Sequence, residues 1–304
     1  MINVAFLGTP SAAVPALASL ADLADIRLVV TQPDSAKGRS SKRSAPPVKL
    51  AADEWGFPVQ QPESHAELHE VLGSTPLDVA VVVAYGRILK PETLALAEHG
   101  FVNLHFSLLP RWRGAAPVER AILAGDTSTG VSLMKLDAGL DTGPVIAEVE
   151  TPIAPYESGG ALTARLASLG ADLLGRALLP YVNGDLVPAQ QLGVGAVHAA
   201  RLTTDEARLT SDLDSDEFAR AVRAFDPRPG AWLMLENARF RVLEAVEAPG
   251  LDVPPGIIEQ IGNRVVAGLA DSTVELLKVQ PSGKKPQSAR SWMNGRRGMR
   301  ASFE

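Results

Sequence analysis

Cysteine is absent from this sequence of 304 residues, and its absence excludes several kinds of chemistry. Without a thiol the chain has no disulfide, no cysteine nucleophile and no cysteine-ligated zinc site. Long apolar runs are also missing, because no window approaches about 18 uninterrupted apolar residues, and the N-terminal MINVAFLGTP has no charged leader. We therefore expect a cytoplasmic protein with neither export nor membrane insertion.

An excess of positive charge is lacking too, since the net charge is −6. A polyanionic partner would have to bind to local basic patches rather than to a generally basic surface. Two such patches lie at residues 37–49 and 278–300, and the second contains no acidic residue. For each patch taken alone, solvated surface charge is the alternative interpretation. Their basic members are Lys37, Arg39, Lys42, Arg43 and Lys49 in the first patch, and Lys278, Lys284, Lys285, Arg290, Arg296, Arg297 and Arg300 in the second.

The first part of the chain alternates strand-like and helix-like segments. Residues 2–7 form an apolar run that ends at a Gly-Thr-Pro turn, and an Ala/Leu-rich stretch with helical spacing follows to about residue 23. Residues 77–84 are apolar at nearly every position, as expected of a parallel strand covered on both faces. The alternation predicts an α/β domain with a doubly wound, mostly parallel sheet. Further strands are expected at 26–31, 101–105, 131–136 and 145–149, and helices at 117–123 and 160–179.

A Gly/Val/Ala-rich connection that begins near residue 182 indicates a domain boundary. Beyond it, a short helix at 215–224 precedes several short strands, separated by Pro and Gly, between residues 231 and 279. This pattern predicts a smaller β-barrel domain of OB-like type. We place the first domain at 1–185, a linker at 186–204 and the second domain at 205–304.

Residues 32–49 (QPDSAKGRSSKRSAPPVK) combine Pro, Gly, Ser and basic residues without apolar periodicity. The segment predicts a long exposed loop. Loops of this length in a compact domain usually serve a function.

Asn103, His105 and Asp141 are the candidate catalytic residues. Asn103 and His105 stand two apart in an expected strand, so their side chains project from the same face. Ligands of open α/β sheets bind outside the carboxyl ends of the strands, where this pair would lie. Asp141 belongs to the turn DAGLDTGP, whose glycines permit tight geometry and close approach to a ligand.

An amide donor, an imidazole and a carboxylate together suit acyl transfer to nitrogen. Asn103 can stabilise the oxyanion that forms when an amine attacks a formyl carbon. His105 can move the protons, because imidazole titrates near the working pH, and Asp141 can orient the ring and favour its protonated form. Structural roles are the alternative, since a strand Asn-x-His is often a hydrogen-bonded pair and Asp141 can be a turn residue.

Longer motifs surround these residues and extend along essentially the whole chain. The motifs are FLGTP (6–10), VVTQPD (29–34), VVVAYGRIL (81–89), NLHFSLLPRWRGAAP (103–117), GD (125–126), TGVSLMKLD (129–137), GLDTGPVI (139–146), RAFDPRPGAW (223–232) and QPSGKKP (280–286). Taken together, they closely resemble the methionyl-tRNA formyltransferase family.

The resemblance implies a Rossmann-like catalytic domain that transfers a formyl group from 10-formyltetrahydrofolate to methionyl initiator tRNA, without a metal. Asn103, His105 and Asp141 match the family's catalytic positions. The folate-contacting turn matches Ser107, Leu108, Leu109 and Pro110, and the apolar wall of the pterin pocket matches Ile88 and Leu89. A purely structural interpretation of Ile88 and Leu89, as core aliphatic residues, stays open.

The resemblance also gives the basic patches a partner. It implies that Arg39, Lys42 and Arg43 contact the acceptor end of the tRNA. The C-terminal domain, with Lys284 and Lys285, would bind tRNA phosphates and add a salt-dependent contribution to affinity. We expect the protein to be a monomer.

Other functions remain as alternatives. A folate-dependent formyltransferase that acts on a ribonucleotide or sugar amine would share the catalytic residues, but the second domain and the basic loop argue against it. A formyltetrahydrofolate hydrolase would be expected to carry a further regulatory domain. A non-catalytic RNA-binding protein of the same fold would not need the three candidate residues, and a dinucleotide-binding protein would need the G-x-G-x-x-G motif, which is absent.

Overall fold

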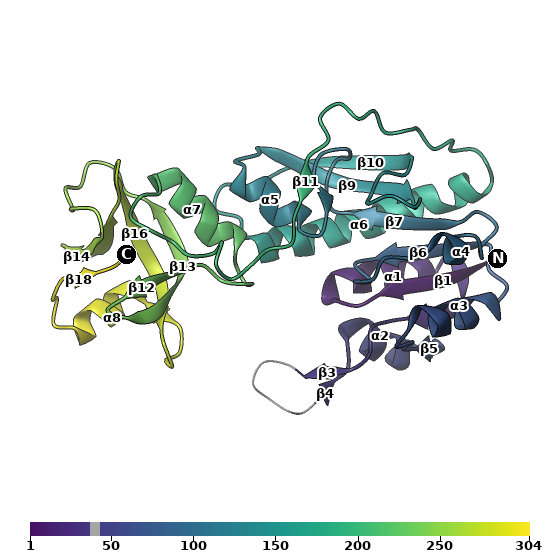
Figure 1. Ribbon diagram of the computed structural model, residues 1–304, viewed down its shortest axis with the longest axis horizontal. Helices are drawn as coiled ribbons and strands as arrows, with labels where there is room; N and C mark the ends of the chain where they lie inside the picture. The colour runs from purple at the N-terminus through teal and green to yellow at the C-terminus, as the bar shows by residue number, and fades with distance from the viewer. Residues whose placement is uncertain (37–42) are drawn as a thin grey trace. The chain divides into compact units, whose positions relative to one another are not determined.

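The computed structural model describes residues 1–36 and 43–304 (Figure 1). Lys37, Arg39 and Lys42 of the first basic patch therefore lie outside the described residues. Contacts divide the chain into two compact units, and the chain enters unit 2 twice before residue 200. Unit 1 comprises Met1–Pro117, Ser128–Pro152 and Thr163–Ala199, and unit 2 comprises Val118–Thr127, Ile153–Leu162 and Ala200–Glu304.

Unit 1 is built on a seven-stranded sheet with the strand order β10-β9-β7-β6-β1-β2-β5. The strands from β7 to β5 are parallel, whereas β9 and β10 form an antiparallel edge. The predicted doubly wound, mostly parallel sheet is therefore confirmed. The strands are β1 (Ile2–Gly8), β2 (Ala24–Val30), β5 (Val59–Gln60), β6 (Val79–Val83), β7 (Phe101–His105), β9 (Ser128–Lys135) and β10 (Val145–Pro152).

Helices cover both faces of this sheet. Every residue of β6 is buried, as are the last five residues of β1. Because successive strand residues point to opposite faces, burial at consecutive positions requires cover on each side. Leu68 and Leu72 of α3 pack on one face, against Leu7 and Val82. The helices of this part of the chain are η1 (Ser11–Ala13), α1 (Val14–Ala21), α2 (Pro47–Trp55), α3 (His65–Gly73), α4 (Pro91–Leu94), α5 (Pro117–Leu123) and α6 (Gly159–Val182).

The expected loop at 32–49 ends earlier than predicted, because α2 begins at Pro47. Proline suits the first turn of a helix, where its missing N–H would be unpaired in any case. Lys49 therefore lies in a helix, and its Nζ binds Asp34 Oδ1 at 3.0 Å and Gln61 Oε1 at 2.6 Å. Before the helix, the two-residue strands β3 (Ser35–Ala36) and β4 (Arg43–Ser44) pair antiparallel.

The segment that follows α6 is attached to unit 1. Strand β11 (His198–Ala199) pairs with β8 (Arg113–Gly114), and Ala189 forms an isolated bridge with Val145. The first part of the expected linker thus lies on the sheet unit, and its hydrogen bonds reach two segments far away in the sequence.

Unit 2 contains an antiparallel sheet with the order β12-β13-β16-β15-β14-β18. A bridge between Leu235 and Phe303 connects the two ends of this sheet, as expected of a barrel-like domain. Helix α7 (Ser215–Ala224) begins at the capping box of Asp214 and Glu217 and packs Phe218 into the core. The strands are β12 (Trp232–Leu235), β13 (Ala238–Glu247), β14 (Ile257–Ile261), β15 (Arg264–Gly268), β16 (Thr273–Pro281), β17 (Gln287–Ser288) and β18 (Ala301–Ser302), with helix α8 (Ala289–Gly295).

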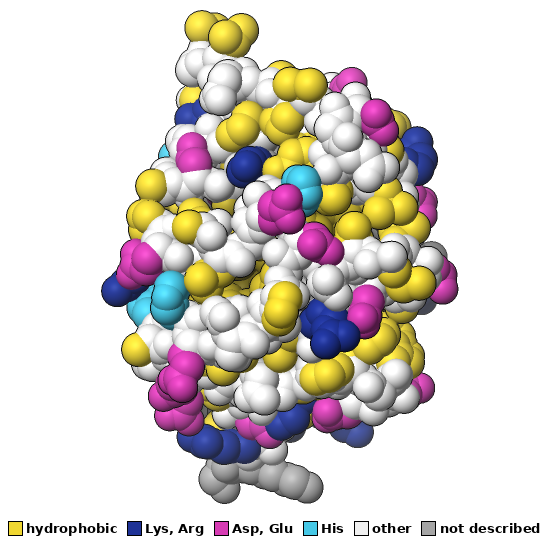
Figure 2. Space-filling view, turned by 90° about the vertical axis from the view of Figure 1, so that its right-hand side faces the viewer, with side chains coloured by type: hydrophobic (Ala, Val, Ile, Leu, Met, Phe, Trp, Pro, Cys, Tyr) yellow, Lys and Arg dark blue, Asp and Glu magenta, His cyan; other side chains and the backbone are white. Residues whose placement is uncertain are grey.

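The surface mixes charges of both signs. Figure 2 shows a face on which acidic, basic and hydrophobic side chains are interspersed among the described residues. Any binding of a polyanion therefore depends on local groups of basic residues. Within residues 1–36 and 43–304, no helix is both long enough and apolar enough to cross a membrane.

Candidate active site

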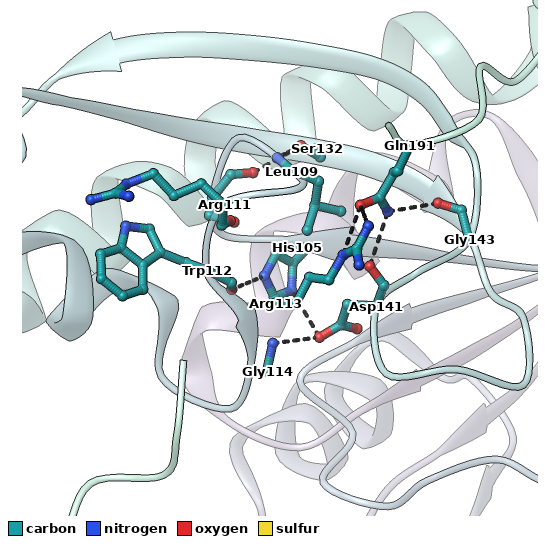
Figure 3. Close-up of polar contacts among 11 residues, drawn as sticks. His105, Leu109, Arg111, Trp112, Arg113, Gly114, Ser132, Asp141, Gly143 and Gln191 are labelled. Atoms are coloured by element: carbon teal, nitrogen blue, oxygen red, sulfur yellow. Dashed lines mark hydrogen bonds and ion pairs between the residues drawn. The ribbon is translucent and has the colours of Figure 1, made fainter. Parts of the chain in front are cut away.

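His105 is the last residue of β7, at the carboxyl edge of the parallel strands, and only 6% of it is exposed. Its Nε2 lies 2.8 Å from the carbonyl oxygen of Trp112, and its Nδ1 lies 3.7 Å from Asp141 Oδ2 (Figure 3). A carbonyl oxygen can only accept, so Nε2 carries a hydrogen and donates it. The ring thus has one nitrogen fixed by the backbone and the other facing a carboxylate.

Asp141 lies in the turn between β9 and β10 and has a positive φ of 51°, in the left-handed region. Its Oδ2 accepts a hydrogen bond of 2.8 Å from the backbone N–H of Gly114. Glycine is required at the neighbouring position 143, where an added Cβ would clash with the backbone oxygen of Lys135. The close contact between the backbones of Gly143 and Lys135 therefore shapes the turn that presents the Asp141 carboxylate to His105.

Asn103 is half-buried in the middle of β7, on the same strand face as His105. Its neighbours in the sheet are Val82 of β6 and Met134 of β9. Among the residues that the structure describes, none forms a hydrogen bond with its side-chain amide. The structure brings His105 and Asp141 together as expected and leaves the donors of Asn103 available to a ligand.

The turn that follows β7 is held by Ser132, which the sequence analysis did not single out. Ser132 is fully buried in β9, and its Oγ lies 3.0 Å from the N of Leu109 and 2.8 Å from the O of Ser107. The Ser107 hydroxyl is itself used within the turn, where it donates to the carbonyl of Arg111 at 2.6 Å. Leu108 and Pro110 are only half-buried, so they are the members of the turn most open to a ligand.

The loop that follows β6 lies at the same sheet edge, because β6 and β7 are adjacent and parallel. Leu89 is buried in a core cluster, as its structural interpretation requires, but Ile88 is 78% exposed and is no core residue. The loop is held through the carbonyl of Tyr85, which accepts from Thr9 Oγ1 at 2.9 Å and Gln32 Nε2 at 3.2 Å. Burial raises the pKa of the Tyr85 hydroxyl above its ordinary value, so this side chain stays neutral.

Gln191 is a second residue that the sequence analysis missed. It lies in the expected linker, yet its side chain contacts Asp141, Gly143 and Arg113 (Figure 3). The Gly/Val/Ala-rich sequence around it contains no motif that would have indicated this position.

The basic residues of the second patch differ in their surroundings. Lys284 and Lys285 are exposed, and among the described residues neither forms an ion pair. Three others are partly neutralised by acidic residues from other strands or turns. The pairs are Lys278 with Glu244 at 3.2 Å, Arg296 with Glu236 at 2.5 Å, and Arg300 with Glu259.

A hollow of about 270 Å³ in unit 2 lies next to the two exposed lysines. Its lining includes Arg239, Arg241 and Trp232, together with residues 280–283, which immediately precede Lys284. The guanidinium of Arg239 lies over the ring of Trp232, 4.3 Å from its centre. The buried Nε of Arg241 has no hydrogen-bond partner within the described part of the chain. Two cationic side chains therefore line this hollow.

Among the described residues, no group of three or more His, Asp or Glu side chains is arranged to hold a metal ion.

Arg43 of the first patch is exposed at the start of β4.

Family models and individual relatives match nearly the whole chain. The model described as formyl transferase matches residues 2–178, and the model of the formyl transferase C-terminal domain matches residues 201–297. Methionyl-tRNA formyltransferase of Halorhodospira halophila is 43% identical over 300 residues, which cover 97% of this chain and 96% of the relative. The protein of the same name from Myxococcus xanthus is 42% identical over 295 residues, which cover 96% and 95%.

Solved structures with lower sequence identity share the fold. HypX from Aquifex aeolicus in complex with tetrahydrofolic acid is 16% identical with a TM-score of 0.66, and the match covers 96% of this chain and 47% of that one. An N-formyltransferase from Helicobacter canadensis in complex with folinic acid and dTDP-3-aminofucose is 17% identical with a TM-score of 0.66, covering 92% of this chain and 100% of that one.

Replacement of Ser132 by alanine tests how the turn after β7 is held. The change leaves the buried N–H of Leu109 unpaired, so we expect the free energy of unfolding to fall by about 1–3 kcal/mol. Urea denaturation measures this change. Thr129→Val in the same strand is the matched control, because the buried Thr129 hydroxyl has no partner among the described residues and its loss removes no hydrogen bond. Equal losses in the two variants would contradict this assignment.

Proposed function

This chain belongs to the formyl transferase family, and we propose that its substrates are 10-formyltetrahydrofolate and methionyl initiator tRNA. It transfers the formyl group to the amino group of the tRNA-bound methionine, for translation initiation. The main support is that relatives named for this acceptor match both of its domains at 42–43% identity. A tRNA acceptor also implies that the reaction takes place in the cytoplasm.

Asn103 supplies the hydrogen bond that formyl transfer needs. When an amine attacks the formyl carbon, negative charge develops on the formyl oxygen, and a fixed amide donor stabilises that charge. The Asn103 amide fits this role, because it lies on the same strand face as His105 and forms no hydrogen bond with any described residue.

His105 and Asp141 manage the protons. The attacking amine must lose a proton, and the nitrogen that releases the formyl group must gain one. The carbonyl of Trp112 holds the hydrogen on Nε2 of His105, which leaves Nδ1 as the nitrogen that can take up and release a proton. Asp141 lies on the Nδ1 side and stabilises the ring when it carries the positive charge.

A folate co-substrate fits the residues at this sheet edge. The exposed side chain of Ile88 and the half-buried Leu108 and Pro110 provide apolar contacts for a flat ring system. We assign to Ser107, Leu89 and Leu109 the role of shaping the turn and the wall, since these side chains are buried. The folate supplies the formyl group when bound, and the two solved structures described above carry folate compounds on the same fold.

We assign tRNA binding to the C-terminal domain, residues 205–304, and to the basic loop with Arg39, Lys42 and Arg43. Lys284 and Lys285 carry unneutralised charge next to a hollow lined by two arginines, which suits the phosphates of an RNA backbone. Arginine and lysine side chains neutralise phosphate charge without reading the base sequence. These contacts would position the tRNA rather than identify its sequence.

The acceptor can be identified by one formylation assay with purified methionyl initiator tRNA, free methionine and glycinamide ribonucleotide offered together. We expect formyl transfer to the tRNA-bound methionine alone, because only this acceptor brings an RNA backbone, with its many phosphates, to the basic residues. Transfer to a free small amine alone would contradict the proposed acceptor.

His105→Ala should lower kcat by roughly two to four powers of ten, the usual contribution of a proton-transfer group. Affinity for folate, measured by fluorescence titration of the unreacted enzyme, should change little, because the ring nitrogens face Trp112 and Asp141. Full retained turnover would remove His105 from the mechanism.

Lys284→Gln combined with Lys285→Gln should weaken tRNA binding and reduce the slope of log affinity against log salt by up to about 2. Filter binding between 50 and 200 mM salt measures this slope over roughly the range where counterion release dominates. The matched control, Lys278→Gln with Arg264→Gln, removes two charges that are already paired with Glu244 and Glu275. A control slope that falls as far as the test slope would argue against a specific role for the lysine pair.

A further inference from the structure

The segment at 186–199 is attached to the candidate active site at three points. Ala189 and Val145 exchange two backbone hydrogen bonds of 2.7 and 2.8 Å, at the start of β10. Further along, the N of Arg113 donates to the carbonyl of Val197 at 2.9 Å, where β8 and β11 pair. Gln191 lies between these two attachments. The backbone on either side of Gln191 is thus held against unit 1.

The side chain of Gln191 uses its full hydrogen-bonding capacity in this position. Its Nε2 donates to the carbonyls of Asp141 at 2.9 Å and Gly143 at 2.7 Å. Its Oε1 accepts from Nε of Arg113 at 2.9 Å and from Nη2 of the same side chain at 2.7 Å. A side-chain amide has two donor hydrogens and two acceptor lone pairs, and here each of them is used.

The contacts of Gln191 hold the two parts of the chain that position the Asp141 carboxylate, namely the backbone of Asp141 and the strand β8. On one side, Gln191 binds the backbone of Asp141 itself, whose φ of 51° is costly for a residue with a Cβ and needs support from its surroundings. On the other side, it binds Arg113, whose neighbour Gly114 donates its N–H to Asp141 Oδ2. One amide therefore connects the backbone of Asp141 with the strand that orients its side chain.

We propose that Gln191 is a positioning residue that acts through Asp141. This inference rests on the proposed role of Asp141 in formyl transfer. Gln191 acts without touching the substrate. It holds the carboxylate at the distance from His105 Nδ1 that the proton transfer uses, and an error of about 1 Å in such a position can cost about 100-fold in rate.

Gln191→Glu separates positioning from packing, because glutamate has the same shape. The carboxylate still accepts from Arg113, but it cannot donate, and it places negative charge against the carbonyls of Asp141 and Gly143. We expect kcat for methionyl-tRNA to fall about 10- to 100-fold while KM stays within about twofold. Gln190→Glu is the control, since Gln190 is exposed and the charge change is identical, and it should leave kcat unchanged.

A double variant shows whether Gln191 acts through Asp141. In an Asp141→Asn enzyme, Gln191→Glu should lower kcat further by less than about twofold, because residues that act as a unit have non-additive effects. Two independent contributions would multiply instead. An unchanged kcat in the single variant, or multiplicative losses in the double variant, would overturn the inference.

Amide hydrogen exchange gives a readout that does not depend on activity. The N–H of Gly114 is held by Asp141 Oδ2, so its exchange should become faster in Gln191→Glu and stay unchanged in Gln190→Glu. Unchanged exchange at Gly114 in Gln191→Glu would overturn the inference, even if the wild-type protein transferred the formyl group to an amine other than methionyl-tRNA. A wild-type protein that fails to formylate methionyl-tRNA, with faster Gly114 exchange in the variant, would instead reject the proposed acceptor and keep the positioning role.

Discussion

The hydrogen bond from the Gly114 N–H to the Asp141 carboxylate is the contact on which the candidate site depends. It orients the carboxylate toward the Nδ1 side of His105, while the Trp112 carbonyl fixes the Nε2 side. Both contacts come from the stretch between β7 and α5, so this stretch holds the ring and its carboxylate at once. Because a backbone N–H donates along a fixed direction, the backbone conformation at Gly114 sets the position of the Asp141 carboxylate.

The sheet topology explains why these groups can meet. Parallel strands bring the ends of β6 and β7 to one edge. Strand β9 runs antiparallel to β7 and ends with Lys135 beside Val102, and the long turn that follows it brings Asp141 to His105 at the end of β7. Ser132 supports the turn after β7 from within β9. The imidazole of His105 and the carboxylate of Asp141 thus come together, with the Asn103 amide on the same face of β7 as His105.

In unit 2, ion pairs reduce the positive charge that is available to a partner. The stretch from 278 to 300 contains basic but no acidic residues, and folding places Glu244, Glu236 and Glu259 against three of its cations. Exposed ion pairs of this kind contribute little to stability, yet they reduce the charge available to a partner. Lys284 and Lys285 form no ion pair with a described residue and directly follow residues 280–283, which line the hollow together with Arg239 and Arg241. The unpaired positive charge therefore covers less of the surface than the sequence indicates.

The sequence by itself determined the fold class, the β7 pair of Asn103 and His105, and the family, because strand and helix periodicities and motif spacings are local properties of the chain. It also predicted Asp141 as the third candidate, from the motif around it. Only the tertiary structure revealed the contacts of Ser132 and Gln191. It also showed that the Ile88 side chain is exposed and that acidic residues neutralise part of the basic stretch. Gln191 lies 50 residues from Asp141 and 78 from Arg113, and no local pattern encodes a hydrogen bond across such separations. Those contacts arise when the path of the folded chain brings the segments together.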